Sequence, residues 1–173
     1  MTNPNYFELF GLPTSFTIDN DALATRYRDL QKMVHPDKFA DAPERERRLA
    51  MEKATLINSA FQTLKQPIHR AQYLLELQGI ALNNENDTFM DGQFLMAQME
   101  LRETLAEIKT QADPLTALSK FLATLQQQTQ QLLDKLNQHC TKADWHAARN
   151  SVRQLQFFNR LQEEAIQLEE TLL

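Results

Sequence analysis

The chain has 173 residues, a formal net charge of −5 and a single cysteine, Cys140. The negative charge argues against a nucleic-acid partner, and one cysteine excludes both an internal disulfide framework and a cysteine-rich zinc module. No apolar run approaches the roughly 20 residues of a membrane-spanning helix, and the first residues lack the pattern of a secretory signal. With only three glycines, the composition predicts an all-α cytoplasmic protein with no cofactor and no membrane contact.

The first part of the chain is predicted to hold four helices. Asn3-Pro4 supplies an N-cap and a first helical position, so a short helix is expected from there to Gly11. Asp19 or Asn20 is expected to cap a second helix, which ends at His35 because Pro36 cannot continue it. The last two helices are predicted over residues 44–64 and 67–78.

The turn between the second and third helices carries His35, Pro36 and Asp37. Because proline pushes the preceding residue out of the α region, the tripeptide should form the tip of a helical hairpin. Upstream of it, Arg26, Arg28 and Lys32 lie mostly off the apolar stripe of the second helix. These three side chains predict a local basic patch that suits an acidic protein surface.

The second part of the chain is predicted to be an antiparallel three-helix bundle, because apolar residues recur at near-heptad spacing. The first bundle helix spans about residues 91–109, and Asp113-Pro114 and Asp144 mark the starts of the other two. A polar, asparagine-rich stretch separates this part from the first. The predicted domains are therefore 1–79 and 91–173, joined by a linker over 80–90.

The first bundle helix carries more apolar surface than a bundle needs. Leu95, Met96 and Met99 project to the side or back of its core-facing stripe, and Glu100 and Glu103 frame them. On the last helix, Phe157 is also predicted to point away from the core. An apolar patch with an acidic rim is typical of a partner site, and methionine suits such a surface. From spacing alone, packing of these residues under the first domain or the linker stays an equal alternative.

Four motifs of the first part resemble the J-domain family, the DnaJ-type co-chaperones. They are Tyr6 to Leu12, the Tyr27 and Leu30 stripe, His35 to Phe39, and Ile57 to Leu64. The resemblance implies that His35, Pro36, Asp37, Arg26, Arg28 and Lys32 bind a DnaK-type chaperone. It further implies that the chain is not itself an enzyme but stimulates the ATPase of that chaperone.

The chain as a whole resembles the HscB-type co-chaperones of iron–sulfur cluster assembly. The matching residues are Arg70 to Leu75, Phe94 to Glu103, Trp145, and Val152 to Leu161. This resemblance implies a monomer whose bundle binds an IscU-type cluster scaffold and delivers it to an HscA-type chaperone. The scaffold-binding positions implied are Leu95, Met96, Met99, Glu100, Glu103 and Phe157. Asp29 departs from the general J-domain pattern, where this position is commonly basic, which fits a specialised chaperone pairing.

Two other functions compete with this interpretation. A J-protein for unfolded clients in general would usually carry a Gly/Phe-rich segment or cysteine-rich zinc repeats, and the composition argues against both. An enzyme could use His35 and Asp37 as an acid–base pair. However, no nucleophile, metal cluster or phosphate-binding loop lies near them in the sequence, so we expect no catalytic residues and no metal.

Overall fold

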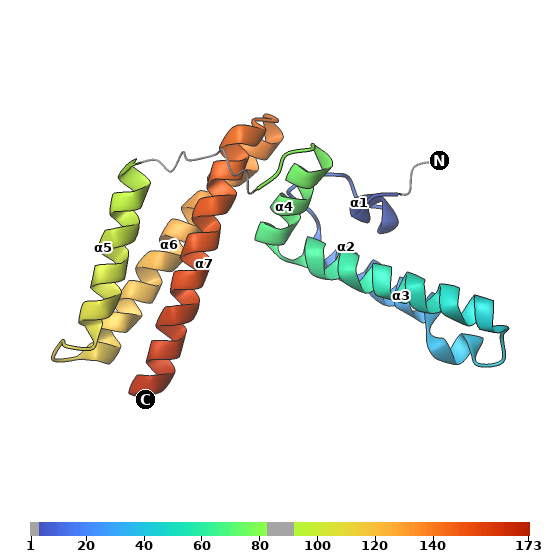
Figure 1. The fold of residues 1–173 in the computed structure, drawn as a ribbon, viewed down its shortest axis with the longest axis horizontal. Coiled ribbons are helices and arrows are strands. Elements are labelled where there is room, and N and C mark those ends of the chain that lie inside the picture. Colours follow the sequence, from blue (N-terminus) through green and yellow to red (C-terminus); the bar gives the residue numbers. More distant parts are fainter. Residues whose placement is uncertain (1–3, 83–91) are drawn as a thin grey trace. The chain divides into compact units, whose positions relative to one another are not determined.

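The computed structural model describes residues 4–82 and 92–173 (Figure 1). Within these ranges the regular structure consists of seven α-helices and one 3-10 helix, without a strand. None of the described helices is both long and apolar enough to cross a membrane. The chain divides into two compact units, Met1–Gly79 and Ile80–Leu173. The predicted all-α fold class is confirmed.

The first unit is built around the hairpin of α2 and α3, which lie side by side in Figure 1. Its elements are α1 (Tyr6–Leu9), α2 (Asn20–Val34), the 3-10 helix η1 (Pro36–Phe39), α3 (Glu44–Lys65) and α4 (Pro67–Leu77). The Asp19 side chain caps α2 by accepting hydrogen bonds from the Asp21 and Ala22 amides. Stacked rings of Tyr27 and Phe61, 4.0 Å apart, join the two long helices.

The N-cap expected for the first helix was wrong. Pro4 lies before α1, and Asn3 lies outside the described residues. Asn5 is the cap: its side chain accepts a hydrogen bond from the Glu8 amide, and the Glu8 carboxylate accepts one from the Asn5 amide. This reciprocal capping box needs an acidic residue three positions after the cap, and only the Asn5 frame supplies one.

The second unit consists of α5 (Gly92–Ile108), α6 (Pro114–Thr141) and α7 (Trp145–Leu172). Asp113 and Asp144 cap α6 and α7 as expected, each accepting a hydrogen bond from a first-turn amide. Leucines and aromatic residues of α6 and α7 are buried along the whole length of both helices, whereas Ile108 is the only buried residue of α5. The bundle core therefore belongs mainly to α6 and α7, and α5 is more lightly attached.

Part of the predicted linker is fixed to α7. Two guanidinium groups donate to its carbonyl oxygens, Arg149 to Ala81 at 3.5 Å and Arg153 to Leu82 at 3.1 Å. The rest of that segment, residues 83–90, falls outside the described residues. The linker boundaries stay a prediction.

Candidate functional site

The first candidate site is the tip of the α2–α3 hairpin. His35 is the C-cap of α2 with an extended backbone (φ −58°, ψ 136°), and Pro36 opens η1. The Asp37 amide donates to His35 Nδ1 at 3.2 Å. The side chains stay open to solvent, 58% exposed for His35 and 93% for Asp37. The proline and the local hydrogen bond thus fix the backbone while leaving both polar side chains available.

This geometry suits docking. Since His35 Nδ1 accepts a hydrogen bond, a neutral ring carries its proton on Nε2 and can donate it outward. The Asp37 carboxylate can accept charge-assisted hydrogen bonds from an arginine or from backbone amides of a partner. Among the described residues no group of three or more His, Cys, Asp or Glu side chains is placed to hold a metal ion.

The predicted basic patch is only partly assembled. At about 100° per residue, Arg28 and Lys32 lie about 40° apart on α2, whereas Arg26 lies on the opposite side. The Arg26 guanidinium instead donates to the carbonyl oxygens of Phe10 and Gly11, both at 2.7 Å. The interpretation of three residues forming one patch was wrong, because helical rotation and these two hydrogen bonds separate Arg26 from the other two.

Gly11 shapes the backbone at the point where Arg26 binds. Its φ of +63° lies in the left-handed region, which a residue with a side chain adopts only with strain. A Cβ added there would lie 3.4 Å from Arg26 Nη1. Arg26 therefore ties the end of α1 to α2 and serves the fold of the first unit.

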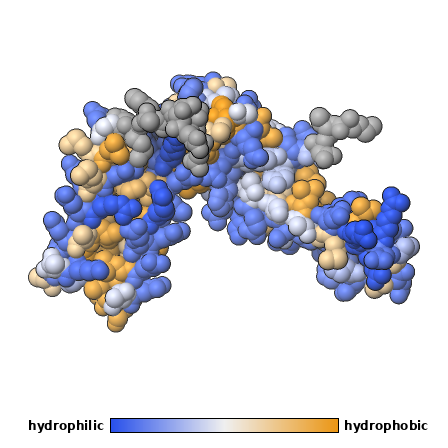
Figure 2. Space-filling model, in the orientation of Figure 1, coloured by the Kyte–Doolittle hydropathy of each residue, from blue (hydrophilic) through white to orange (hydrophobic). Residues whose placement is uncertain are grey.

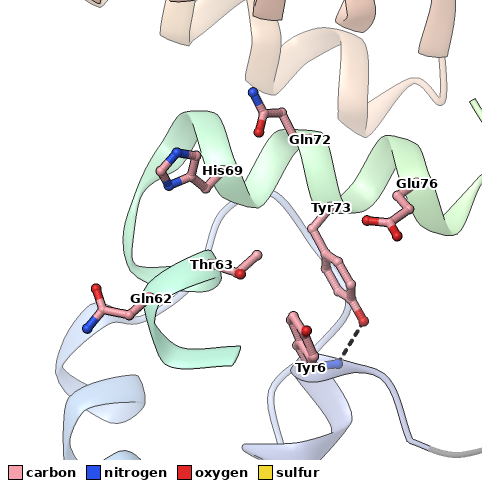
Figure 3. A pocket seen from close by; sticks show the side chains of 7 residues that line it. All are labelled: Tyr6, Gln62, Thr63, His69, Gln72, Tyr73 and Glu76. Carbon is pink, nitrogen blue, oxygen red and sulfur yellow. Dashed lines mark hydrogen bonds between the residues drawn. The ribbon is translucent and has the colours of Figure 1, made fainter. Parts of the chain in front are cut away.

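A polar recess between α1, α3 and α4 was not expected from the sequence. It has a volume of about 400 Å³ and includes Tyr6, His69, Gln72, Tyr73 and Glu76 in its lining. Figure 3 shows the Tyr6 and Tyr73 rings facing each other and the Tyr6 amide bonded to the Tyr73 hydroxyl, at 2.9 Å. The rings stack with centroids 4.4 Å apart, and burial raises the pKa of Tyr73 above its usual value. These contacts attach α1 to α4, 67 residues further along the chain.

The second candidate site is on α5. Leu95 is 41% exposed, and Met96 and Met99 are each 64% exposed. Glu100 and Glu103 are exposed as well. Figure 2 shows hydrophobic side chains next to hydrophilic ones at the upper end of α5. These five side chains, called the α5 patch below, share an accessible helix surface.

Phe157 does not belong to the exposed part of this surface. Its side chain is only 3% exposed, with its ring 5.8 Å from that of Phe94 and 5.6 Å from that of Phe158. The prediction that it points away from the core was wrong. The spacing of α7 residues alone places Phe157 off the core-facing stripe. In the structure Phe94 of α5 covers this side of α7, and Phe157 is buried beneath it.

Two residues near Phe157 were missed. Arg102 on α5 pairs with Glu164 on α7, with 3.1 Å between Nη1 and Oε2. The Arg102 guanidinium also lies over the Phe157 ring, 5.5 Å from its centroid. Arg102 follows Leu95 by seven residues, which places both on one side of α5. This spacing was the sequence signal that Arg102 belongs to the same region of the helix as the patch.

Cys140 is a half-buried residue near the end of α6. Burial raises the pKa of its thiol to about 11. The neutral thiol is a poor nucleophile, as expected for a residue packed at a helix end.

Comparison with known proteins identifies the family of the chain. The chain is 46% identical over 169 residues to the "Co-chaperone protein HscB homolog" of Vibrio cholerae, covering 98% of this chain and 99% of the relative. This chain belongs to the HscB co-chaperone family. Within this family assignment, residues 5–73 match the DnaJ domain, and residues 90–166 match the family described as "HSCB C-terminal oligomerisation domain".

Solved structures of HscB proteins have the same fold. "Chaperone HscB from Vibrio cholerae" aligns with a TM-score of 0.91 at 44% identity, covering 98% of this chain and 100% of that one. The human co-chaperone HscB aligns with a TM-score of 0.90 at 30% identity, covering 100% of this chain and 85% of that one. Membership of this J-domain co-chaperone family implies that the chain has a DnaK-type chaperone as partner. The residue roles, the scaffold and the monomeric state stay predictions.

Proposed function

We propose that this protein binds an IscU-type iron–sulfur scaffold through its second unit and delivers it to an HscA-type chaperone. The first unit then stimulates the ATPase of that chaperone, which assists cluster assembly and transfer. The observation that carries the proposal is the exposure of Leu95, Met96 and Met99 on one helix of the domain that distinguishes HscB proteins from other J-proteins.

The α5 patch has the composition of a protein-binding surface. Three large apolar side chains remain in contact with water, so a partner that covers them recovers roughly 25 cal/mol for each Å² of apolar area. Methionine adapts its shape to a partner, and the neighbouring Glu100 and Glu103 carboxylates can form a charged rim around the apolar centre. A scaffold face with apolar residues beside basic ones would complement this surface.

The chaperone side of the proposal rests on the hairpin tip and on Arg28 and Lys32. The two cations can steer the first unit towards an acidic surface of the ATPase domain, and the tip can then dock. Docking accelerates hydrolysis only if it favours the hydrolysis-competent state of the chaperone. Meanwhile the bound scaffold is held at high effective concentration near the client site. ATP hydrolysis itself takes place on the chaperone.

The double variant Leu95→Ala/Met99→Ala tests the scaffold proposal. The loss of a single central apolar anchor, worth about 2 kcal/mol, weakens binding about thirtyfold. Calorimetric titration of the double variant with an IscU-type scaffold should therefore show at least this loss. Thermal unfolding should stay close to that of the unchanged protein, since exposed substitutions usually cost less than about 0.5 kcal/mol.

The matched control is Ile166→Ala on α7, because Ile166 is 43% exposed and Leu95 is 41% exposed. This control should bind the scaffold normally. A double variant that binds as tightly as the control would rule out the α5 patch as the scaffold site.

A further inference from the structure

The apolar residues of the α5 patch lie on the half of its helix that is least supported by the core. The buried residue Ile108 is at the C-terminal end of α5, and Leu95 and Met99 are in the N-terminal half. A helix attached mainly at one end can rotate or fray at the other end. Contacts other than core burial must therefore hold the patch in a defined orientation.

A small cluster between α5 and α7 supplies these contacts. The Phe94 and Phe157 rings form a T-shaped pair with an interplanar angle of 86°. The Arg102 guanidinium covers the Phe157 ring and at the same time pairs with Glu164. A second oxygen of the same carboxylate is 3.4 Å from Arg102 Nη1.

The cluster acts on the stripe of α5 that carries the patch. Arg102 follows Leu95 by seven residues and Met99 by three, so all three lie along one side of the helix. Phe94 precedes Leu95 directly. An ion pair and a ring contact at these positions oppose rotation of α5 about its own axis, and this rotation would turn Leu95 and Met99 away from a partner.

We propose that Arg102, Glu164 and Phe157 are positioning residues that orient the α5 patch for its partner. The proposal rests on the proposed scaffold-binding function and assigns a different role to Phe157 from the one implied by the resemblance. Phe157 is 3% exposed, so it supports binding from beneath the surface. Pre-orientation lowers the cost of ordering the surface on binding.

Charge exchange across the pair tests this role. In Arg102→Glu or Glu164→Arg, like charges face each other and the ion pair between α5 and α7 is lost. A half-exposed ion pair changes an equilibrium by up to about fivefold, and repulsion adds to this, so scaffold affinity should fall by about three- to tenfold. The double variant Arg102→Glu/Glu164→Arg restores opposite charges and should recover most of the affinity.

Amide hydrogen exchange of the free protein gives a second readout that needs no scaffold. Each single variant should speed amide exchange in the N-terminal half of α5 by a factor similar to its loss of scaffold affinity. The amides near Ile108 should exchange at an unchanged rate. In the double variant, exchange in the N-terminal half should return towards that of the unchanged protein. Glu163→Arg is the control, because it makes the same charge change and Glu163 has no ion pair with any described residue. It should alter neither readout.

Three outcomes would overturn the proposal. One is unchanged exchange in the N-terminal half of α5 in both single variants. Another is weaker binding in Arg102→Glu that the double variant does not restore, since Arg102 would then touch the scaffold directly. The third is a loss of affinity and a rise in exchange in Glu163→Arg equal to those in Glu164→Arg. The effect would then come from the change in net charge and not from the Arg102–Glu164 pair. Normal scaffold binding by Leu95→Ala/Met99→Ala would instead reject the proposed function. The exchange experiment would still test whether the cluster holds the N-terminal half of α5 in place, since it needs no scaffold.

Discussion

The hairpin tip and the α5 patch are both exposed, but different kinds of contact shape them. At the tip, residues adjacent in the chain determine the geometry: Pro36 ends α2, and the Asp37 amide bonds to His35. At the patch, α7 residues more than fifty positions away hold the helix that displays it. The tip therefore depends on local sequence, and the patch depends on the tertiary packing of its domain.

This difference predicts how each site responds to mutation. Changes at the tip should remove a function without affecting the fold. Around the patch, a change in a buried supporting residue should affect stability and binding together, while a change in an exposed residue should affect binding alone.

Phe157→Ala should give the largest effect. The ring is buried against Phe94 and Phe158, and such truncations cost about 3–5 kcal/mol of unfolding free energy. Urea denaturation measures this loss, with Met99→Ala as the comparison, which should stay within about 0.5 kcal/mol. If Phe157→Ala is as stable as Met99→Ala, the Phe157 ring is not part of the core. The patch would then not depend on tertiary packing in the way that distinguishes it from the tip.

Asp37→Asn should reduce stimulation of the HscA-type ATPase by more than about tenfold, because the amide cannot supply the charge that a docking arginine needs. Stability and scaffold affinity should not change, since the carboxylate is 93% exposed. Steady-state ATP turnover with purified chaperone is the measurement. Asp41→Asn, an exposed residue of the same connection, should stimulate normally; equal loss in both variants would indicate a general charge effect.

A smaller effect should separate two arginines of α2. Arg28→Glu should weaken chaperone binding a few-fold and make it less sensitive to salt, because Arg28 acts through exposed charge. Arg26→Gln should instead lower the unfolding free energy by about 1 kcal/mol or more, since it removes hydrogen bonds to two carbonyls. Titrations at two salt concentrations and denaturation curves measure these effects. Reversed outcomes would place Arg26 at the interface and Arg28 in the fold.

The sequence predicted features that depend on local chemistry. Helix periodicity, the caps Asp19, Asp113 and Asp144, and the exposed tip all follow from residues a few positions apart. For Leu95, Met96 and Met99 the spacing left two alternatives open, a partner site or packing under the first domain or the linker, and the structure leaves all three side chains exposed.

The N-cap of the first helix was a local error, because Asn3 was chosen over Asn5. The other two errors arose where distant residues decide the outcome. Phe157 was assigned to the surface because its cover, Phe94, lies on another helix. Arg26 was assigned to the basic patch because its carbonyl partners, Phe10 and Gly11, lie before α2 in the chain. Neither contact has a spacing rule that a single sequence reveals.

The Tyr6–Tyr73 contact has a consequence for synthesis of the chain. Tyr6 of α1 leaves the ribosome before its stacking partner on α4, which emerges 67 residues later. The α2–α3 hairpin, joined by contacts such as Tyr27–Phe61, lies wholly before Tyr73 in the chain and can form earlier. The tip is therefore shaped before the first unit closes, and a nascent chain could present it to a chaperone while α1 is still undocked.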